Sequence, residues 1–245
     1  AGVTPFTESF FQSFDFRSRK AINVVGFVKG TKFPDSYIVF TAHYDHLGIV
    51  KRKIQNGADD NASGVSGLLT IADTLKENPP EHSVIFVATD AEEPGLYGAK
   101  AFVEDNQYIV SRAVLNINLD MIAQDSGRRN RLYIAGTKSL ELLKNETPGF
   151  IKDSYICLKV GHDGTKLRGF NSADVIDWRN ASDHAVFRRK DIPYLFFSVD
   201  VHSLYHTEKD DFDAINPNFY WRSVNTIYDI FRKVDSMPLA RTNSK

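Results

Sequence analysis

Four short apolar runs, each followed closely by acidic or histidine side chains, constrain the fold more than any other feature of the sequence. The runs are rich in β-branched and aromatic residues and lie at 37–42, 83–89, 113–119 and 193–199. Because each run is apolar throughout rather than alternating, it predicts a strand that is covered on both faces, as in a parallel sheet. Two further strands are expected at 22–29 and 131–135.

Helical patterns separate these runs. The clearest have apolar residues at three- and four-residue spacing over 62–77 and 218–234. Strand followed by helix, repeated, predicts an α/β fold with a mostly parallel twisted sheet and helices on both faces. The stretches 78–81 and 147–149 are of loop length, and the sequence shows no repeat or long linker. We therefore expect a single domain over residues 1–245.

The composition excludes several classes of function. The chain has 30 Lys and Arg against 31 Asp and Glu, so its net charge is −1, and the charges are spread along its length. Neither nucleic acid nor an anionic membrane is therefore an expected partner. The apolar runs are far shorter than the roughly 20 residues that a membrane helix needs. The single cysteine, Cys157, allows no disulfide within the chain.

The residues that follow the four runs carry the candidate chemistry. In chain order they are His43 and Asp45, then Asp90, Glu92 and Glu93, then Asp120, and after a short loop His206. Ligands of open α/β sheets bind beyond the carboxyl ends of the strands, so these side chains are expected to converge. Asp59 and Asp60, ahead of the helix at 62–77, add two carboxylates. Such a set suits zinc, and cobalt or manganese would accept the same donors.

The size of this set matches a site for two metal ions. Two ions a few Å apart need one bridging carboxylate and about two further protein ligands each. Hydrolysis at such a site also needs a carboxylate that is not a ligand, which takes a proton from water and returns it to the leaving amine. The adjacent Glu92 and Glu93 offer one residue of each kind.

Each of these residues also has a structural explanation. A single histidine at a strand end is usually structural or solvated, and adjacent glutamates usually form a surface pair. Paired aspartates before a helix usually cap it, as Asp59, Asp60 and Asn61 could do. The occurrence of ligand-type residues after four separate strands favours a common metal site over these separate explanations.

Five motifs resemble those of the zinc metallopeptidase family that includes bacterial leucyl aminopeptidases, glutamate carboxypeptidase and glutaminyl cyclases. In family order they are TAHYDHLG at 41–48, GADDNASG at 57–64, AEEPGLYGA at 91–99, NLDM at 118–121 and YHTEKD at 205–210. The resemblance spans residues 22–232, nearly the whole chain. It implies a two-zinc exopeptidase built on the α/β fold expected above.

The resemblance implies a role for five metal ligands. His43 and Asp120 would hold one ion, and Glu93 and His206 would hold the other, with Asp60 bridging the two. The family pattern thus selects Asp60 over its neighbour Asp59, which would cap the helix or support the site from outside.

Three residues outside the ligand set also acquire roles from the resemblance. Glu92 would be the general base, and Asp45 would orient the imidazole of His43. Tyr205 matches a position from which some relatives donate a hydrogen bond to the tetrahedral intermediate. The alternative for Tyr205 is packing beneath His206.

The segment before His184 differs from some relatives, which carry a disulfide-bounded tyrosine there. Residues 178–181 of this chain are Trp-Arg-Asn-Ala, and Arg179 could face a substrate carboxylate. The sequence Ser-Asp-His at 182–184 resembles a family element that lines the substrate pocket, with His184 expected to be structural. The resemblance assigns no role to four further histidines, His46, His82, His162 and His202.

The expected function is hydrolysis of the N-terminal peptide bond of a peptide that has a free amino terminus. One alternative is a glutaminyl cyclase, which needs a single zinc ion and no attacking water. A second is a carboxypeptidase for acidic C-terminal residues, which would need pocket arginines drawn from Arg168, Arg179, Arg188 and Arg189. A non-catalytic binding domain is disfavoured because every ligand and Glu92 is present. The resemblance also implies a secreted or periplasmic protein.

Overall fold

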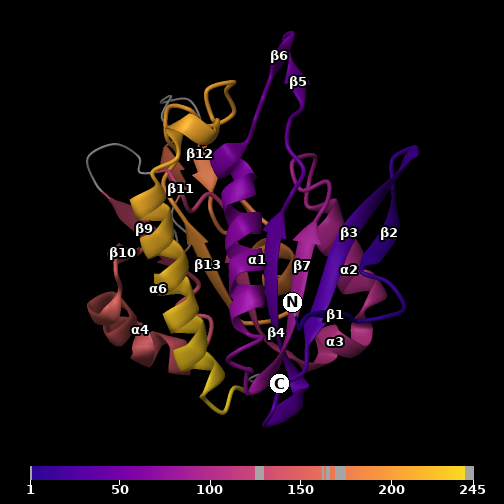
Figure 1. Cartoon of the computed structure of the whole chain (residues 1–245), viewed down its shortest axis with the longest axis vertical. Helices are drawn as coiled ribbons and strands as arrows, with labels where there is room; N and C mark the ends of the chain where they lie inside the picture. The colour runs from indigo at the N-terminus through magenta and orange to yellow at the C-terminus, as the bar shows by residue number, and fades with distance from the viewer. Residues whose placement is uncertain (1, 125–129, 162, 164–165, 169–174, 241–245) are drawn as a thin grey trace.

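The computed structural model describes residues 2–124, 130–161, 163, 166–168 and 175–240, which form a nine-stranded mixed sheet with helices packed against it (Figure 1). The strands of this sheet are β1 (Thr4–Pro5), β2 (Phe11–Phe16), β3 (Arg19–Val28), β4 (Phe33–His43), β7 (His82–Thr89), β8 (Ala113–Leu119), β9 (Arg131–Ala135), β10 (Cys157–Val160) and β13 (Tyr194–Ser198). Their order is β1-β3-β7-β4-β8-β13-β9-β10, and β2 pairs with β3.

Strand pairing is parallel at the centre of the sheet and antiparallel next to it. β4 runs parallel to β7 and β8, and β8 runs parallel to β13. β3 joins β7 in antiparallel pairing, and β9 joins β13 in the same way. The four central strands are the four apolar runs, and the two further expected strands form as β3 and β9. The α/β class is thus confirmed, with a sheet that is mixed because its flanks run the other way.

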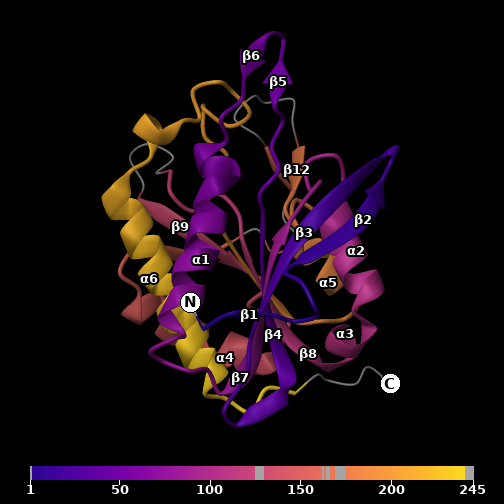
Figure 2. The ribbon, with the colours of Figure 1, turned by 45° about the vertical axis from the view of Figure 1, so that its right-hand side comes forward.

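Helices cover both faces of the sheet (Figures 1 and 2). One face carries α1 (Gly64–Thr74), α4 (Glu141–Asp153) and α6 (Pro217–Asp235), and the other carries α2 (Tyr97–Asp105), α3 (Gln107–Arg112) and α5 (His184–Arg188). Along β4, Ile38 and Phe40 pack into the first core, and Tyr37 and Val39 pack into the second. This two-sided burial explains the uniformly apolar strands. Within the described ranges, no helix is long and apolar enough to span a membrane.

The two expected helices form with somewhat different bounds. α6 matches the expected range 218–234 to within one residue, because the Asn216 side chain accepts the N–H of Phe219 and Pro217 occupies the first turn. α1 begins only at Gly64. The preceding Ala58–Ser63 form η1, an irregular π-helical turn in which Asp60 departs from helical backbone angles.

The expectation of a loop at 147–149 is wrong. These residues lie inside α4, where Pro148 removes one backbone hydrogen-bond donor. Leu143 and Phe150 of the same helix are buried in the core. Burial of two large apolar side chains is worth roughly 3–6 kcal/mol, which matches or exceeds the cost of about 3 kcal/mol for a proline in a helix.

Two small antiparallel two-stranded sheets lie outside the main sheet. One is the hairpin of β5 (Ile49–Val50) and β6 (Lys53–Ile54), and the other pairs β11 (Lys166–Arg168) with β12 (Val175–Asp177). The β5–β6 hairpin follows β4 and projects beyond the carboxyl ends of the central strands (Figure 1). It therefore lies at the same end of the strands as the residues that follow the four apolar runs.

Candidate metal centre

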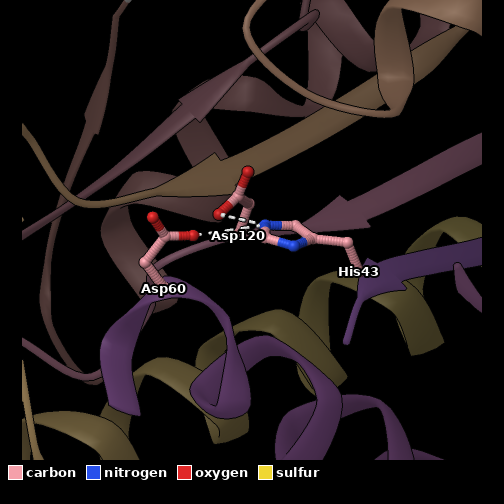
Figure 3. Close-up of side chains that lie close together, drawn as sticks. All are labelled: His43, Asp60 and Asp120. Atoms are coloured by element: carbon pink, nitrogen blue, oxygen red, sulfur yellow. Dashed lines mark ion pairs between the residues drawn. The ribbon is translucent and has the colours of Figure 1, made fainter. Parts of the chain in front are cut away.

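The carboxyl ends of the parallel strands converge on a cluster of imidazoles and carboxylates. His43 is the last residue of β4, Asp120 follows β8 directly, and Glu92 and Glu93 follow β7. Asp60 reaches the same place from η1 (Figure 3). These five side chains line one cavity of about 50 Å³. The structure thus brings together residues that are far apart in sequence, as the sheet topology predicts.

The first donor group consists of His43, Asp60 and Asp120, all buried. The Nε2 atom of His43 lies 3.3 Å from Oδ1 of Asp60 and 3.5 Å from Oδ1 of Asp120 (Figure 3). Donor atoms placed about 2.0–2.1 Å from a tetrahedral zinc ion lie about 3.3 Å from one another. The spacing and chemistry of these three side chains therefore fit one ion.

The second donor group consists of Asp60, Glu93, His206 and His46. The Nε2 atom of His206 lies 3.1 Å from Oδ2 of Asp60 and 3.5 Å from Oε2 of Glu93. The Nδ1 atom of His46 lies 2.8 Å from Oε1 of Glu93 and 3.9 Å from Oδ2 of Asp60. His46, Asp60 and Glu93 by themselves satisfy the spacing of a metal site. Sequence reasoning missed His46, although it lies only three residues after His43.

Asp60 presents one carboxylate oxygen to each donor group. Its Oδ1 faces His43, and its Oδ2 faces His206. Burial alone would raise the pKa of Asp60, but hydrogen bonds with His206 and His43 outweigh burial and hold the pKa well below its usual range. An ionised carboxylate with one oxygen toward each group is suited to contact two ions at once.

The carboxylates in turn favour positive charge on the two histidines. Burial opposes a charge on His43, yet Asp120 raises its pKa well above the usual value. Burial likewise opposes a charge on His206, but Asp60 and Glu93 raise its pKa. The cavity therefore has an excess of negative charge that protons or metal cations can neutralise. Imidazole and carboxylate donors are those that zinc accepts.

Glu92 lines the cavity but belongs to neither donor group. Burial, assisted by Asp120, Asp183 and Glu93, raises the pKa of Glu92 to about 9 against the opposing effect of His43. A cation in either donor group would lower this pKa again, because a nearby positive charge favours the ionised carboxylate. Glu92 thus lies in the same cavity as both donor groups without belonging to either.

Asp45 contacts His43 through its main chain, whereas the sequence predicts that its carboxylate makes that contact. Its backbone carbonyl, 3.1 Å from Nδ1 of His43, accepts the imidazole N–H, whereas its carboxylate Oδ1 lies 3.7 Å from that nitrogen. The carboxylate accepts the backbone N–H groups of Glu92 and Glu93, at 2.9 and 3.3 Å. Asp45 therefore orients His43 through its main chain and fixes the Glu92–Glu93 turn through its side chain.

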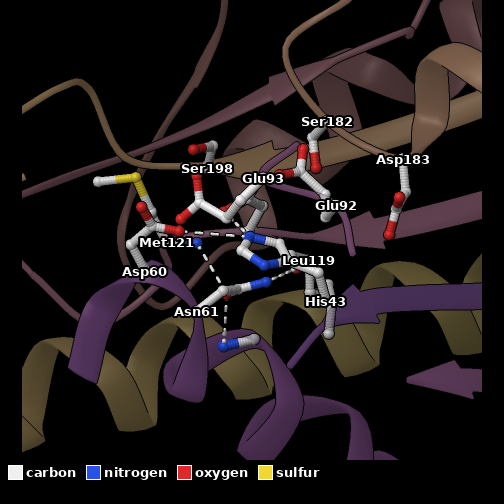
Figure 4. Close-up of polar contacts among 12 residues, drawn as sticks. His43, Asp60, Asn61, Glu92, Glu93, Leu119, Met121, Ser182, Asp183 and Ser198 are labelled. Carbon is white, nitrogen blue, oxygen red and sulfur yellow. Dashed lines mark hydrogen bonds and ion pairs between the residues drawn. The ribbon is translucent and has the colours of Figure 1, made fainter. Parts of the chain in front are cut away.

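Asn61 connects the Asp60 turn to the strand end that carries Asp120 (Figure 4). Its Nδ2 donates to the carbonyl of Leu119 at 3.0 Å, and its Oδ1 accepts the N–H of Met121 at 3.1 Å. Leu119 and Met121 flank Asp120, and Asn61 follows Asp60. One buried amide side chain therefore fixes two carboxylates of the first donor group relative to each other.

Asp59 and Asp210 support the same turn from outside the donor groups. The carboxylate of Asp210 accepts the N–H groups of Asp59 and Asp60, both at 3.0 Å. Asp59 accepts the N–H of Ala123 at 2.8 Å and pairs with Nε2 of His202 at 3.1 Å. Asp59 makes no side-chain cap of the following helix. Of the two adjacent aspartates, Asp60 alone reaches the donor groups.

Tyr205 packs directly against a ligand candidate. Its ring stacks on His206 with the centroids 3.7 Å apart, and it also lines the cavity. Burial, followed by the carboxylates of Asp60, Asp120 and Glu93, raises the pKa of the phenol. Tyr205 therefore packs against His206, as the alternative expected, and keeps a protonated hydroxyl that can donate a hydrogen bond.

His184 is structural, as expected. Its buried ring stacks on Phe196 and Tyr194, with centroids 4.2 and 5.1 Å away, and its Nε2 donates to the carbonyl of Trp178 at 2.9 Å. Burial lowers the pKa of His184 to about 3, so the ring is neutral at physiological pH. Its role is to pack the wall beside the cavity.

Arg179, Arg188 and Arg189, the candidate arginines whose side chains the structure describes, do not form the pocket that a carboxypeptidase would need. Arg188 and Arg189 both donate to the side-chain oxygen of Asn180, at 3.0 and 2.8 Å, and Arg179 is exposed. Among the residues that the structure describes, no arginine lines the cavity. The side chain of Arg168 and the whole of His162 lie outside the described residues.

A larger groove of about 650 Å³ lies beside the same turn but contains none of the donors. Its walls include Ala62 from η1 and Ser66 from the start of α1, together with Phe212 and Tyr220. The groove is mostly apolar, whereas the small cavity gathers every candidate ligand except the two loop histidines. Chemistry rather than size therefore identifies the candidate site.

Comparisons with known proteins agree with this geometry. Residues 23–231 match the model of Peptidase family M28. Aminopeptidase YwaD of Bacillus subtilis (strain 168) is 30% identical over 205 residues, which cover 82% of this chain and 42% of YwaD. The crystal structure of BSAP, a zinc aminopeptidase from Bacillus subtilis, matches with a TM-score of 0.70 at 25% identity, over 89% of this chain and 51% of that chain.

The fold is shared more widely than the sequence. A glutaminyl cyclase from an Acidobacteriales bacterium matches with a TM-score of 0.66 at 16% identity, over 92% of this chain and 80% of that chain. The present chain spans about half the length of YwaD and of BSAP. From the match over residues 23–231, the chain belongs to peptidase family M28.

Proposed function

We propose that this protein is a two-zinc aminopeptidase that hydrolyses the N-terminal peptide bond of peptides with a free amino terminus. The observation that carries the proposal is the position of Asp60, whose two oxygens face two different donor groups. Family M28 membership and the aminopeptidase activity named for YwaD and BSAP support an exopeptidase.

The ligand assignment follows the two donor groups. His43 and Asp120 would hold one ion, Glu93 and His206 would hold the other, and Asp60 would bridge them. Zinc at such a site polarises a carbonyl and lowers the pKa of a water to about 7.

Glu92 would move the proton in this reaction. Its carboxylate would accept a proton from the attacking water and return it to the nitrogen of the leaving amine. Two observations support this role: Glu92 lines the cavity without joining a donor group, and Asp45 anchors its backbone N–H.

The remaining walls of the cavity would position the substrate. Tyr205 would donate a hydrogen bond to the oxygen that becomes negatively charged. Trp178, Phe196 and Val201 supply apolar surface beside the candidate ligands. We therefore expect a preference for an apolar N-terminal side chain.

The test combines zinc content with a substrate panel. We expect two zinc ions per chain and chelator-sensitive release of arylamine from aminoacyl arylamides, restored by zinc. An N-acetylated arylamide is the matched control and should not be cleaved. One zinc ion with cyclisation of N-terminal glutamine would replace the proposal with a cyclase. Release of acidic C-terminal residues without arylamide cleavage would replace it with a carboxypeptidase.

A further inference from the structure

The imidazole of His46 is buried without an ordinary hydrogen-bonding partner. Its side chain is 10% exposed, and neither ring nitrogen makes a hydrogen bond of acceptable geometry within the described part of the chain. The 2.8 Å between its Nδ1 and Oε1 of Glu93 is a close approach of the two side chains without that geometry. A buried polar group without a partner is costly, so the position of His46 calls for a ligand.

The nitrogen nearest to the carboxylates is placed as a metal donor would be. The Nδ1 atom of His46 lies 2.8 Å from Glu93 and 3.9 Å from Oδ2 of Asp60. These distances bracket the roughly 3.3 Å expected between two donors on one tetrahedral zinc ion. His206 approaches the same two carboxylates, and its ring centroid is 5.9 Å from that of His46.

The neighbouring backbone leaves room for the His46 ring. A Cβ atom added to Gly57 would lie 2.8 Å from both Cγ and Cδ2 of His46 and 2.4 Å from the carbonyl oxygen of Asp60. Gly57 also has a φ of +66°, which disfavours other residues. Gly57, which directly precedes η1, thus has no side chain in the space that the imidazole of His46 occupies.

We infer, building on the two-zinc function proposed above, that His46 is a fourth protein ligand of the second ion, beside Asp60, Glu93 and His206. The first position, with His43, Asp60 and Asp120, has three protein donors. Four protein donors close a tetrahedral zinc site, whereas three leave one position open for water or substrate. The second ion would accordingly be the more tightly held, and an open coordination position would belong to the first ion.

The test measures zinc binding by the intact chain and two His46 variants. His46→Gln removes the nitrogen at the Nδ1 position, whereas the side-chain amide of His46→Asn places a donor close to it. We expect His46→Gln to weaken the tighter zinc ion by about 100-fold or more, because even loss of partners outside the ligand shell costs 10–100-fold. His46→Asn should recover part of the affinity. Tyr44→Phe, a change in the same segment, should bind zinc as the unmodified protein does.

Cobalt substitution supplies a second readout that does not depend on activity. Loss of a protein ligand from the second ion should change the visible absorption of the cobalt-loaded protein in His46→Gln but not in Tyr44→Phe. Thermal unfolding of the metal-free forms checks that both variants fold. Wild-type zinc affinities and an unchanged cobalt spectrum in His46→Gln would overturn the role of His46 alone. Failure of the unmodified protein to bind two ions would overturn the two-zinc function as well.

Discussion

The two donor groups share Asp60 but differ in how the chain holds them. In the first group, the His43 side chain is only 2% exposed, ends β4 and pairs across the ladder with Thr89. In the second group, the His206 side chain is 35% exposed and lies in a loop with a left-handed φ of 56°. The first group is therefore built on the rigid sheet, and the second depends on loop contacts.

This difference identifies what each group needs to keep its geometry. The backbone N–H of Asp120 donates to the carbonyl of Phe197, so the sheet itself holds this ligand. Glu93 depends on the Asp45 carboxylate, and His206 depends on the Tyr205 ring stacked against it. Changes in the contacts of Glu93 and His206 should therefore affect the second ion selectively, whereas a change at Asp60 should affect both.

Asp60→Asn should produce the largest effect. Loss of the shared carboxylate removes a donor from both groups, so we expect fewer than one zinc ion per chain and no measurable peptidase activity. His43→Gln and His206→Gln are the matched controls, and each should cost one ion. Elemental analysis of the dialysed proteins measures the difference. Retention of two ions in Asp60→Asn would show that Asp60 is not shared.

Glu92→Gln should produce the second-largest effect on activity, because it removes the proposed proton acceptor and leaves both donor groups unchanged. We expect kcat to fall by about 10²–10⁴-fold, the range typical of a general base. Zinc content should stay at the level of the unmodified protein, since Glu92 belongs to neither group. Steady-state kinetics and elemental analysis of the same sample provide the check. Loss of an ion would instead make Glu92 a ligand.

Asp45→Asn should distinguish the groups directly. The carboxylate binds the N–H groups of Glu92 and Glu93, whereas His43 is bound by the Asp45 main chain. We expect zinc affinity at the second position to fall about 10–100-fold and affinity at the first position to change little. Competition with chelators of graded strength resolves the two ions. Selective loss of the first ion would restore the original expectation that the carboxylate orients His43.

His184→Phe should have the smallest effect and leave both groups intact. The pKa of His184 is about 3 in the folded state and about 6.5 when unfolded, so the unfolded chain binds the extra proton between these pH values. This residue's contribution to stability is present above pH 6.5 and is lost as the pH falls toward 3. Between these pH values the free energy of unfolding should rise with pH less steeply in the variant, by up to about 1.4 kcal/mol per pH unit.

Urea unfolding of the metal-free protein at several pH values measures this slope. Comparison of the variant with the unmodified chain isolates His184 from the other titrating groups. An identical slope in both proteins would mean that the His184 ring accepts a proton in the folded state.

The central strands and the strand-end ligands could be predicted from the sequence because they depend on local patterns. Uniform apolar runs predicted β4, β7, β8 and β13, and the direction of a parallel sheet predicted that His43 and Asp120 would meet. The same reasoning wrongly predicted a loop at 147–149, because burial of Leu143 and Phe150 stabilises the helix α4 around Pro148.

The contacts of the loops could not be predicted, because they depend on irregular backbone. Only the shape of η1 shows why Asp60 faces the donors while Asp59 binds the chain near Ala123. The position of the His46 ring depends on the space beside Gly57. The spacing of the motifs in the sequence gives no information about that space. A signal was available in hindsight, since His46 shares a motif with His43.

The most direct test of two ion positions is a crystal structure of the zinc-loaded protein with anomalous scattering recorded at the zinc edge. The account predicts two peaks, one among His43, Asp60 and Asp120, and one among Asp60, Glu93, His206 and His46. A single peak, or two peaks that do not share Asp60 as a ligand, would contradict it.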